Sequence, residues 1–156
     1  MTATNHVITG ALVAAYVEHP FIAIPLAFLA HFAMDAIPHF RITAKNDMER
    51  FNQRAFKKLL MADTAVAVLL IVVIPLLLYG IRPWWLVVVC MMACASPDLA
   101  WGWRFFLALH KRIDKKKNTF SRLHSLIQWS ETQSGIYVEL AWFLAVSLLV
   151  LLKSRP

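Results

Sequence analysis

The segment HFAMDAIPHF, residues 31–40, places two histidines and an aspartate in an otherwise apolar stretch of the chain. His31 and Asp35 are four residues apart, so on a helix their side chains lie on one face. Pro38 disfavours helical geometry at the residue before it, which allows His39 to turn back toward that face. Carboxylates and neutral imidazoles are common ligands of divalent metal ions, and an ion compensates the cost of a buried acid. The segment therefore predicts ligands of a metal site at the end of a helix.

Acids also stand in three other apolar segments, at a similar depth. Counted from one end of its own segment, Asp35 lies 14 residues in, Asp63 17, Asp98 14 and Glu139 13. At a rise of about 1.5 Å per residue, all four lie roughly 20–25 Å from the same face of a helical bundle. His6 begins the first apolar segment on that side. The predicted metal ligands are His6, His31, Asp35, His39 and Asp63.

Two further residues are predicted to act as general acid and base. Asp98 follows Pro97 in SPDLAW, residues 96–101, where the proline frees backbone groups and bends a helix. His124 stands in SRLHSLIQW, residues 121–129, in a connection that can fold against the same layer. Both side-chain types can take a proton from water or protonate a leaving group. Alternatively, Asp98 caps a helix, and Glu139 serves only as a hydrogen-bonding partner.

The elements that would position these residues are hydrophobic helices. Of the 156 residues 60% are hydrophobic and the mean hydropathy is +0.60, above the range typical of soluble domains. Residues 64–81 run without a charge, which is close to the length that crosses a bilayer. Five helical segments are expected, at about 4–18, 20–37, 59–80, 83–104 and 132–152. The predicted fold is an all-α integral membrane bundle in a single domain, residues 1–156, with the first two helices short. A very hydrophobic soluble bundle is the alternative.

Basic residues predict the orientation of this bundle. Of the 16 Lys and Arg residues, 13 lie in the connections 38–58 and 104–131. By the positive-inside rule both connections and the N-terminus are cytoplasmic, in a multi-pass protein. The net charge of +7 then reflects topology, so the expected partners are anionic lipid head groups rather than nucleic acid. Three arginines are predicted to hold a substrate phosphate: Arg41, Arg104 and Arg122. Alternatively, they only anchor the ends of helices.

Two features of the sequence argue against a secreted, disulfide-linked protein. No Lys or Arg precedes Arg41, so no secretory signal peptide is predicted. Cys90 and Cys94, the two cysteines, are four residues apart in an apolar segment and predict no disulfide framework. The sequence predicts no oligomeric state.

Three short motifs follow one another along the chain: NHVITG (5–10), MDAIPHF (34–40) and LHSLIQW (123–129). In this the chain resembles the membrane-bound, metal-dependent hydrolases that include the LexA-binding, inner-membrane-associated hydrolases. The resemblance implies metal-binding or catalytic roles for His6, Asp35, His39 and His124, and a location in the inner membrane. The chain departs from the family where MDAIPHF carries one acid in place of a Pro-Asp-x-Asp-His cluster. The Arg-Gly-x-x-His pattern before the later serine is also absent.

Together these features predict a metal-dependent hydrolase at the cytoplasmic interface of the inner membrane. Zinc or manganese is the expected ion, because it lowers the pKa of a bound water and polarises an ester oxygen. A lipid or lipid-linked (phospho)ester is the expected substrate, because the site lies at head-group depth. One alternative is a non-catalytic membrane adaptor, which would bind no metal. Another is a cation or proton transporter. Against it, the outer two-thirds of each segment lacks ionisable residues that could form a path across the membrane.

Overall fold

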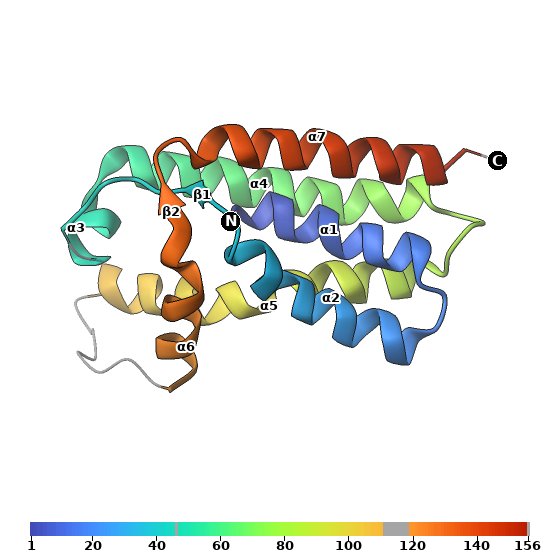
Figure 1. Ribbon diagram of the computed structural model, residues 1–156, viewed down its shortest axis with the longest axis horizontal. Coiled ribbons are helices and arrows are strands. Elements are labelled where there is room, and N and C mark those ends of the chain that lie inside the picture. The colour runs from blue at the N-terminus through green and yellow to red at the C-terminus, as the bar shows by residue number, and fades with distance from the viewer. Residues whose placement is uncertain (46, 111–118, 156) are drawn as a thin grey trace.

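The computed structural model describes residues 1–45, 47–110 and 119–155, and in these it is mostly helical (Figure 1). Five longer helices form a bundle. They are α1 (Ala3–Tyr16), α2 (Pro20–Asp35), α4 (Arg54–Leu77), α5 (Trp84–Leu109) and α7 (Gly135–Lys153). Two short helices, α3 (Asp47–Asn52) and α6 (Thr119–Ile127), lie at one end of the bundle, together with a 3-10 turn, η1 (Gln128–Ser130).

The prediction of a mostly helical chain with five hydrophobic segments is confirmed, and the first two helices are the shortest of the five. The all-α expectation is wrong in one detail. The structure contains a pair of two-residue strands, β1 (His39–Phe40) and β2 (Glu131–Thr132), which run parallel with His39 opposite Glu131. This pair joins residues about ninety positions apart, and local sequence patterns carry no signal for such a contact.

The central helix is α1, which packs against α2, α4, α5 and α7. In Figure 1 it runs between α4 and α7 on one side and α2 and α5 on the other. Small residues allow this close packing: Gly10, Ala11, Ala14 and Ala15 are all buried. A Cβ atom added to Gly10 would lie 2.4 Å from the carbonyl oxygen of Cys90, so the backbones of α1 and α5 are in direct contact. This contact places the first turn of α1 beside the middle of α5.

The strand pair fixes the position of α6 over the end of α2. Ser130, which precedes β2, donates a hydrogen bond from its Oγ to the carbonyl oxygen of Ala36, at 3.0 Å. The backbone of Gly135 passes so close to His39 that an added Cβ would lie 2.1 Å from the His39 carbonyl carbon. The segment from α6 to α7 is therefore held against the chain that leaves α2.

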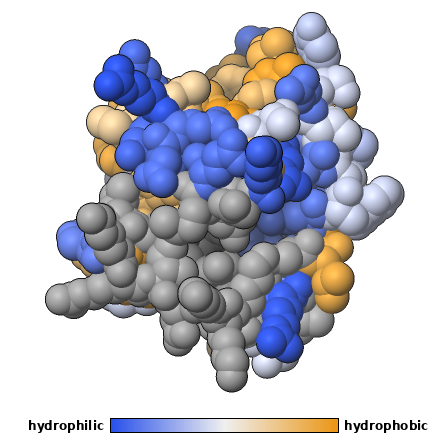
Figure 2. Space-filling view, turned by 90° about the vertical axis from the view of Figure 1, so that its left-hand side faces the viewer, coloured by the Kyte–Doolittle hydropathy of each residue, from blue (hydrophilic) through white to orange (hydrophobic). Residues whose placement is uncertain are grey.

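The outer surface of the bundle is apolar. Two helices, α4 and α7, are long and apolar enough to cross a membrane, and only 17% and 22% of their most apolar windows are buried within the protein. Large side chains on α2 are also exposed, among them Phe21 at 85% and Leu29 at 60%. Figure 2 shows the end of the molecule that carries α3 and α6, where hydrophilic side chains gather. An apolar belt with a hydrophilic end is the surface expected of a protein partly embedded in lipid.

Candidate metal centre

Four metal-ligating side chains meet where α1, α2 and α5 converge. They are His6 from α1, His31 and Asp35 from α2, and Asp98 from α5. One ligand atom from each lies within 4.8 Å of all the others. The side chains of His6, His31 and Asp35 are fully buried, whereas that of Asp98 is 27% exposed. We call these four residues the His/Asp cluster.

The spacing within the His/Asp cluster suits ligands of one ion. His6 Nε2 lies 3.2 Å from Asp35 Oδ1 and 3.7 Å from Asp98 Oδ2. His31 Nε2 lies 3.3 Å from Asp35 Oδ2 and 3.9 Å from Asp98 Oδ1. Zinc binds nitrogen and oxygen at about 2.0–2.2 Å, so neighbouring ligands of one ion lie roughly 3–4 Å apart. The cluster could therefore hold a metal ion.

His124, from α6, extends the cluster. Its side chain is buried, and its Nε2 lies 2.8 Å from Asp35 Oδ2 and 3.0 Å from His31 Nε2. The same nitrogen is 4.0 Å from Asp98 Oδ1. One turn later Gln128 donates a hydrogen bond from Nε2 to Asp35 Oδ2, at 3.1 Å. The amino group of Met1 also contacts Asp35 Oδ1. Asp35 is thus the acid on which the surrounding side chains converge.

The histidines themselves fit a metal ion. His31 donates a hydrogen bond from Nδ1 to the carbonyl oxygen of Cys94 at 2.8 Å, which leaves a lone pair on Nε2 directed at the cluster. His6 is fully buried, and its Nε2 lies 3.2 Å from Asp35 Oδ1 without a well-directed hydrogen bond to any of the described residues. Unpaired polar atoms are rare in protein interiors because burying them is costly. A cation between His6 and the two aspartates would satisfy this nitrogen.

Two acids predicted to share the site instead hold the N-terminus of α1. Asp63 Oδ2 and Oδ1 accept hydrogen bonds from the backbone N–H groups of Ala3, at 2.8 Å, and Thr4, at 3.0 Å. Glu139 accepts from the backbone N–H groups of Thr2 and Phe40, at 3.3 and 3.0 Å. The first N–H groups of a helix lack partners within the helix, and the Thr2 side chain makes no capping bond. Acids from α4 and α7 therefore cap α1.

The structure likewise places His39 outside the His/Asp cluster. The residues around Pro38 do leave the helix, but the chain then enters β1 instead of folding back over Asp35. His39 donates from Nδ1 to the carbonyl oxygen of Ile37 at 2.9 Å, and its Nε2 lies 3.8 Å from Glu131 Oε1. Burial alone would raise the pKa of Glu131. The proximity of His39 and the charges of Arg50 and Arg41 outweigh burial and hold that pKa below its usual value.

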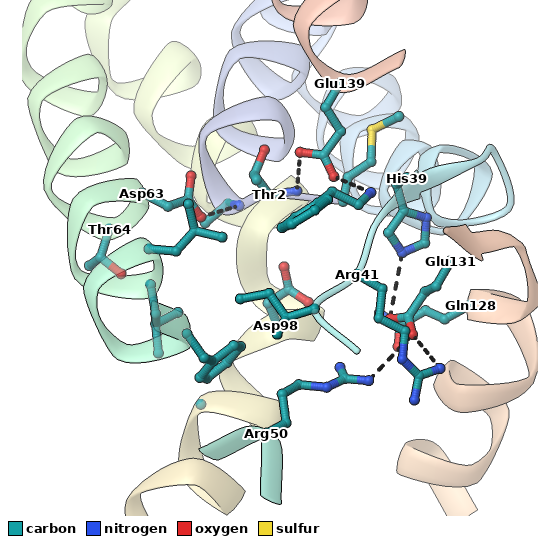
Figure 3. Close-up of a pocket in the computed structure, with 18 of the residues that line it drawn as sticks. Thr2, His39, Arg41, Arg50, Asp63, Thr64, Asp98, Gln128, Glu131 and Glu139 are labelled. Atoms are coloured by element: carbon teal, nitrogen blue, oxygen red, sulfur yellow. Dashed lines mark hydrogen bonds and ion pairs between the residues drawn. The ribbon is translucent and has the colours of Figure 1, made fainter. Parts of the chain in front are cut away.

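A pocket of about 380 Å³ adjoins the cluster, and Asp98 and Gln128 line it (Figure 3). Among the arginines predicted to hold a phosphate, Arg41 lines this pocket. Arg122 is exposed and is not among the lining residues, and the side chain of Arg104 is outside the described part of the chain. Arg50 also lines the pocket, although no sequence motif pointed to it, because it lies in a segment predicted to be a connection.

Comparison of the chain with protein-family models, with curated proteins and with solved structures finds no match. The likeness of its three motifs to the membrane-bound hydrolases therefore stays a prediction. The site itself consists of the buried His/Asp cluster and the pocket beside it.

Proposed function

We propose that the protein is a metal-dependent hydrolase that acts on a lipid or lipid-linked (phospho)ester at the cytoplasmic face of the inner membrane. One observation carries the proposal: two imidazoles and two carboxylates lie within 4.8 Å of one another, and His6 Nε2 is buried without a well-directed hydrogen bond to any of the described residues. Zinc and manganese accept this mixture of nitrogen and oxygen ligands.

The ligand roles follow from burial. His6, His31 and Asp35 are fully buried and would hold the ion, with His124 of α6 as a further ligand. When bound, a divalent ion lowers the pKa of a coordinated water and polarises an ester or phosphoester oxygen. Cys94 and Gln128 orient His31 and Asp35 through hydrogen bonds, as outer partners of metal ligands commonly do.

Asp98 is the cluster residue placed to take part in proton transfer. It lines the pocket and its side chain is partly exposed, so a water and a substrate entering the pocket reach it. We assign it the role of general base, which accepts a proton from the attacking water. His124 is the alternative acid or base; in that role its Nε2, which lies 4.0 Å from Asp98 Oδ1, would exchange a proton in place of binding the ion.

The membrane location is supported by the apolar surface of α4 and α7, each long enough to cross a bilayer. The basic residues of the connections 38–58 and 104–131 favour a cytoplasmic position for this end of the bundle, and with it for the His/Asp cluster. Head-group esters lie at this depth, which is why a lipid or lipid-linked substrate fits better than a soluble one.

Metal analysis of the protein purified in detergent tests the proposal. The wild type should carry close to one equivalent of zinc or manganese and hydrolyse a chromogenic ester or phosphoester. Asp35→Asn keeps the side-chain shape but removes the charge that favours a divalent ion, so both metal content and hydrolysis should fall at least tenfold. Glu18→Gln is the matched control, because Glu18 is an exposed acid paired with Arg82. Equal metal content in wild type and Asp35→Asn would contradict the proposal and favour a non-catalytic adaptor.

A further inference from the structure

We propose that the pocket beside the His/Asp cluster binds a phosphorylated amphiphile, with its phosphate held by Arg41 and Arg50 and its apolar chain lying between α4 and α5. The inference rests on the proposed function, because it names the substrate class of the same site. It depends on two walls of the pocket that differ in chemistry, one polar and one apolar.

The polar wall holds two guanidinium groups against one carboxylate, while three further acids, Asp63, Asp98 and Glu139, line the pocket elsewhere. Arg41 Nη1 lies 2.9 Å from Glu131 Oε2, and Arg50 Nη2 lies 3.5 Å from the same oxygen. Two guanidinium groups therefore share one carboxylate, and Figure 3 shows both directed toward Glu131. Guanidinium groups bind phosphate through paired hydrogen bonds. Glu131 neutralises one of the two guanidinium charges, so a phosphate in the pocket would pair with the other.

Two nitrogens on this wall lack partners. Arg50 Nε is buried with no hydrogen-bond partner among the described residues, and the same holds for His39 Nε2. The His39 side chain is only 3% exposed, and its nearest acid, at 3.8 Å, is beyond hydrogen-bond distance. Both residues line the pocket. A bound anion would supply the acceptor that the buried Arg50 Nε–H lacks. His39 donates from Nδ1 to the carbonyl oxygen of Ile37, so its neutral ring presents a lone pair at Nε2 and does not donate to the anion.

The opposite wall is apolar and reaches the outer surface of the bundle. It is lined by Phe56, Leu59 and Leu60 of α4 and by Ala95 and Leu99 of α5. Leu59 and Leu99 are 41% and 63% exposed, so this wall continues into the apolar exterior. Because α4 is long enough to cross a membrane, its exposed apolar side chains would face lipid. An alkyl chain can therefore enter the pocket between α4 and α5 without passing through water.

The same pocket places the ligand against the catalytic groups. Asp98 lines the pocket and also lies 3.7 Å from His6 Nε2, so it stands between the ligand and the buried histidines. Gln128 lines the pocket as well and hydrogen bonds to Asp35. A ligand that fills the pocket would thus also contact Asp98, while a small anion without a chain would gain nothing from the apolar wall.

Binding of octyl phosphate to the whole protein, in micelles of a maltoside detergent and with metal removed by a chelator, tests the inference. Wild type should bind octyl phosphate at least tenfold more tightly than octyl glucoside or inorganic phosphate. Arg50→Met keeps the length of the side chain and removes its charge, so it should weaken octyl phosphate binding about tenfold. The control is Arg54→Met, because Arg54 is exposed and does not line the pocket. Thermal unfolding of each variant establishes that it is folded.

Gly102→Leu tests the apolar wall separately. Gly102 lines the pocket, and among the described residues an added Cβ would meet nothing within 4 Å, so the position has room for the first atom of a larger side chain directed along the pocket wall. It should weaken octyl phosphate binding and leave inorganic phosphate binding unchanged.

Three results would overturn the inference. Equal affinity of octyl phosphate for wild type and Arg50→Met would exclude the arginine site. Equal affinity of octyl glucoside and octyl phosphate would exclude recognition of the phosphate, and equally tight binding of inorganic phosphate would exclude the role of the chain. Because the metal is removed, these outcomes are independent of the proposed metal centre, which is judged by metal content and hydrolysis alone.

Discussion

At the scale of single residues, His31 and His39 illustrate how position decides the role of a histidine. Both flank Asp35 in the sequence, four residues to either side. The family resemblance predicts a metal-binding or catalytic role for His39 and not for His31. The structure instead places His31 in the His/Asp cluster and His39 beside Glu131. The difference arises because His31 is in α2 and shares a helix face with Asp35. His39 is in β1, where the extended chain directs it to β2.

We therefore expect His31→Gln to lower metal affinity at least tenfold, while His39→Gln leaves metal content nearly unchanged. His31 supplies a ligand nitrogen that the hydrogen bond to Cys94 holds in place, and loss of even an outer partner commonly costs tenfold or more. Metal content after dialysis against a zinc buffer measures the difference. The opposite ranking would show that β1 moves to bring His39 to the ion.

At the scale of elements, α1 is positioned by groups that belong to other helices. Its first N–H groups are bound by Asp63 of α4 and Glu139 of α7, and its backbone touches α5 at Gly10. Since His6 lies in the first two turns of α1, these contacts also decide where its imidazole lies.

Asp63→Ala should destabilise the protein by about 1–2 kcal/mol, the usual cost of losing a helix N-cap. The two hydrogen bonds to Ala3 and Thr4 are lost, whereas every ligand of the His/Asp cluster is retained. Unfolding in a denaturing detergent measures the loss of stability, and metal analysis should show that the folded protein still binds its ion. A variant of unchanged stability that binds no metal would instead make Asp63 a ligand.

Gly10→Ala should lower stability more than the addition of one methyl group usually does. The added methyl group would lie 2.6 Å from the Cα of Met91 as well as against the Cys90 carbonyl, and backbone atoms cannot rotate away. Helices α1 and α5 must separate, which costs roughly 1–3 kcal/mol and moves His6 away from Asp98. Both stability and metal affinity should fall together.

The matched control is Gly102→Ala, at a position on α5 where a Cβ has open space. This change should be neutral or stabilising, because glycine costs a helix interior up to about 1 kcal/mol relative to alanine. Equal effects of the two substitutions would show that the helix contact at Gly10 is looser than the structure describes.

At the scale of the whole molecule, the surface divides into an apolar belt and a hydrophilic end. The belt includes most of α4 and α7, and the hydrophilic end carries α3 and α6 (Figures 1 and 2). The His/Asp cluster lies toward that end, so in a membrane the orientation of the protein would decide which compartment the cluster faces.

Labelling of single added cysteines in intact cells tests this orientation. A membrane-impermeant thiol reagent should label Tyr79→Cys, at the exposed turn after α4, and should label Lys45→Cys only after the cells are permeabilised. The native thiols of Cys90 and Cys94 are buried, so the background should be low. Labelling of Lys45→Cys from outside would reverse the predicted topology.

The sequence by itself determined the helices and the depth of the polar groups. Long apolar runs specify helices because each must satisfy its own backbone hydrogen bonds in an apolar environment. The i, i+4 spacing of His31 and Asp35 specifies a shared face. These are local properties, and the five predicted segments match α1, α2, α4, α5 and α7 to within a few residues at most of their ends.

Only the tertiary structure decided which acids meet. Asp35, Asp63, Asp98 and Glu139 have similar depth, but depth does not state the direction in which a side chain points around its helix axis. That direction is set by packing: α1 meets α5 closely at Gly10, which brings His6 to Asp98, while Asp63 and Glu139 face the open N–H groups of α1. The strand pair that brings Glu131 to His39 and α6 to Asp35 joins distant parts of the chain, and no local pattern specifies such a contact.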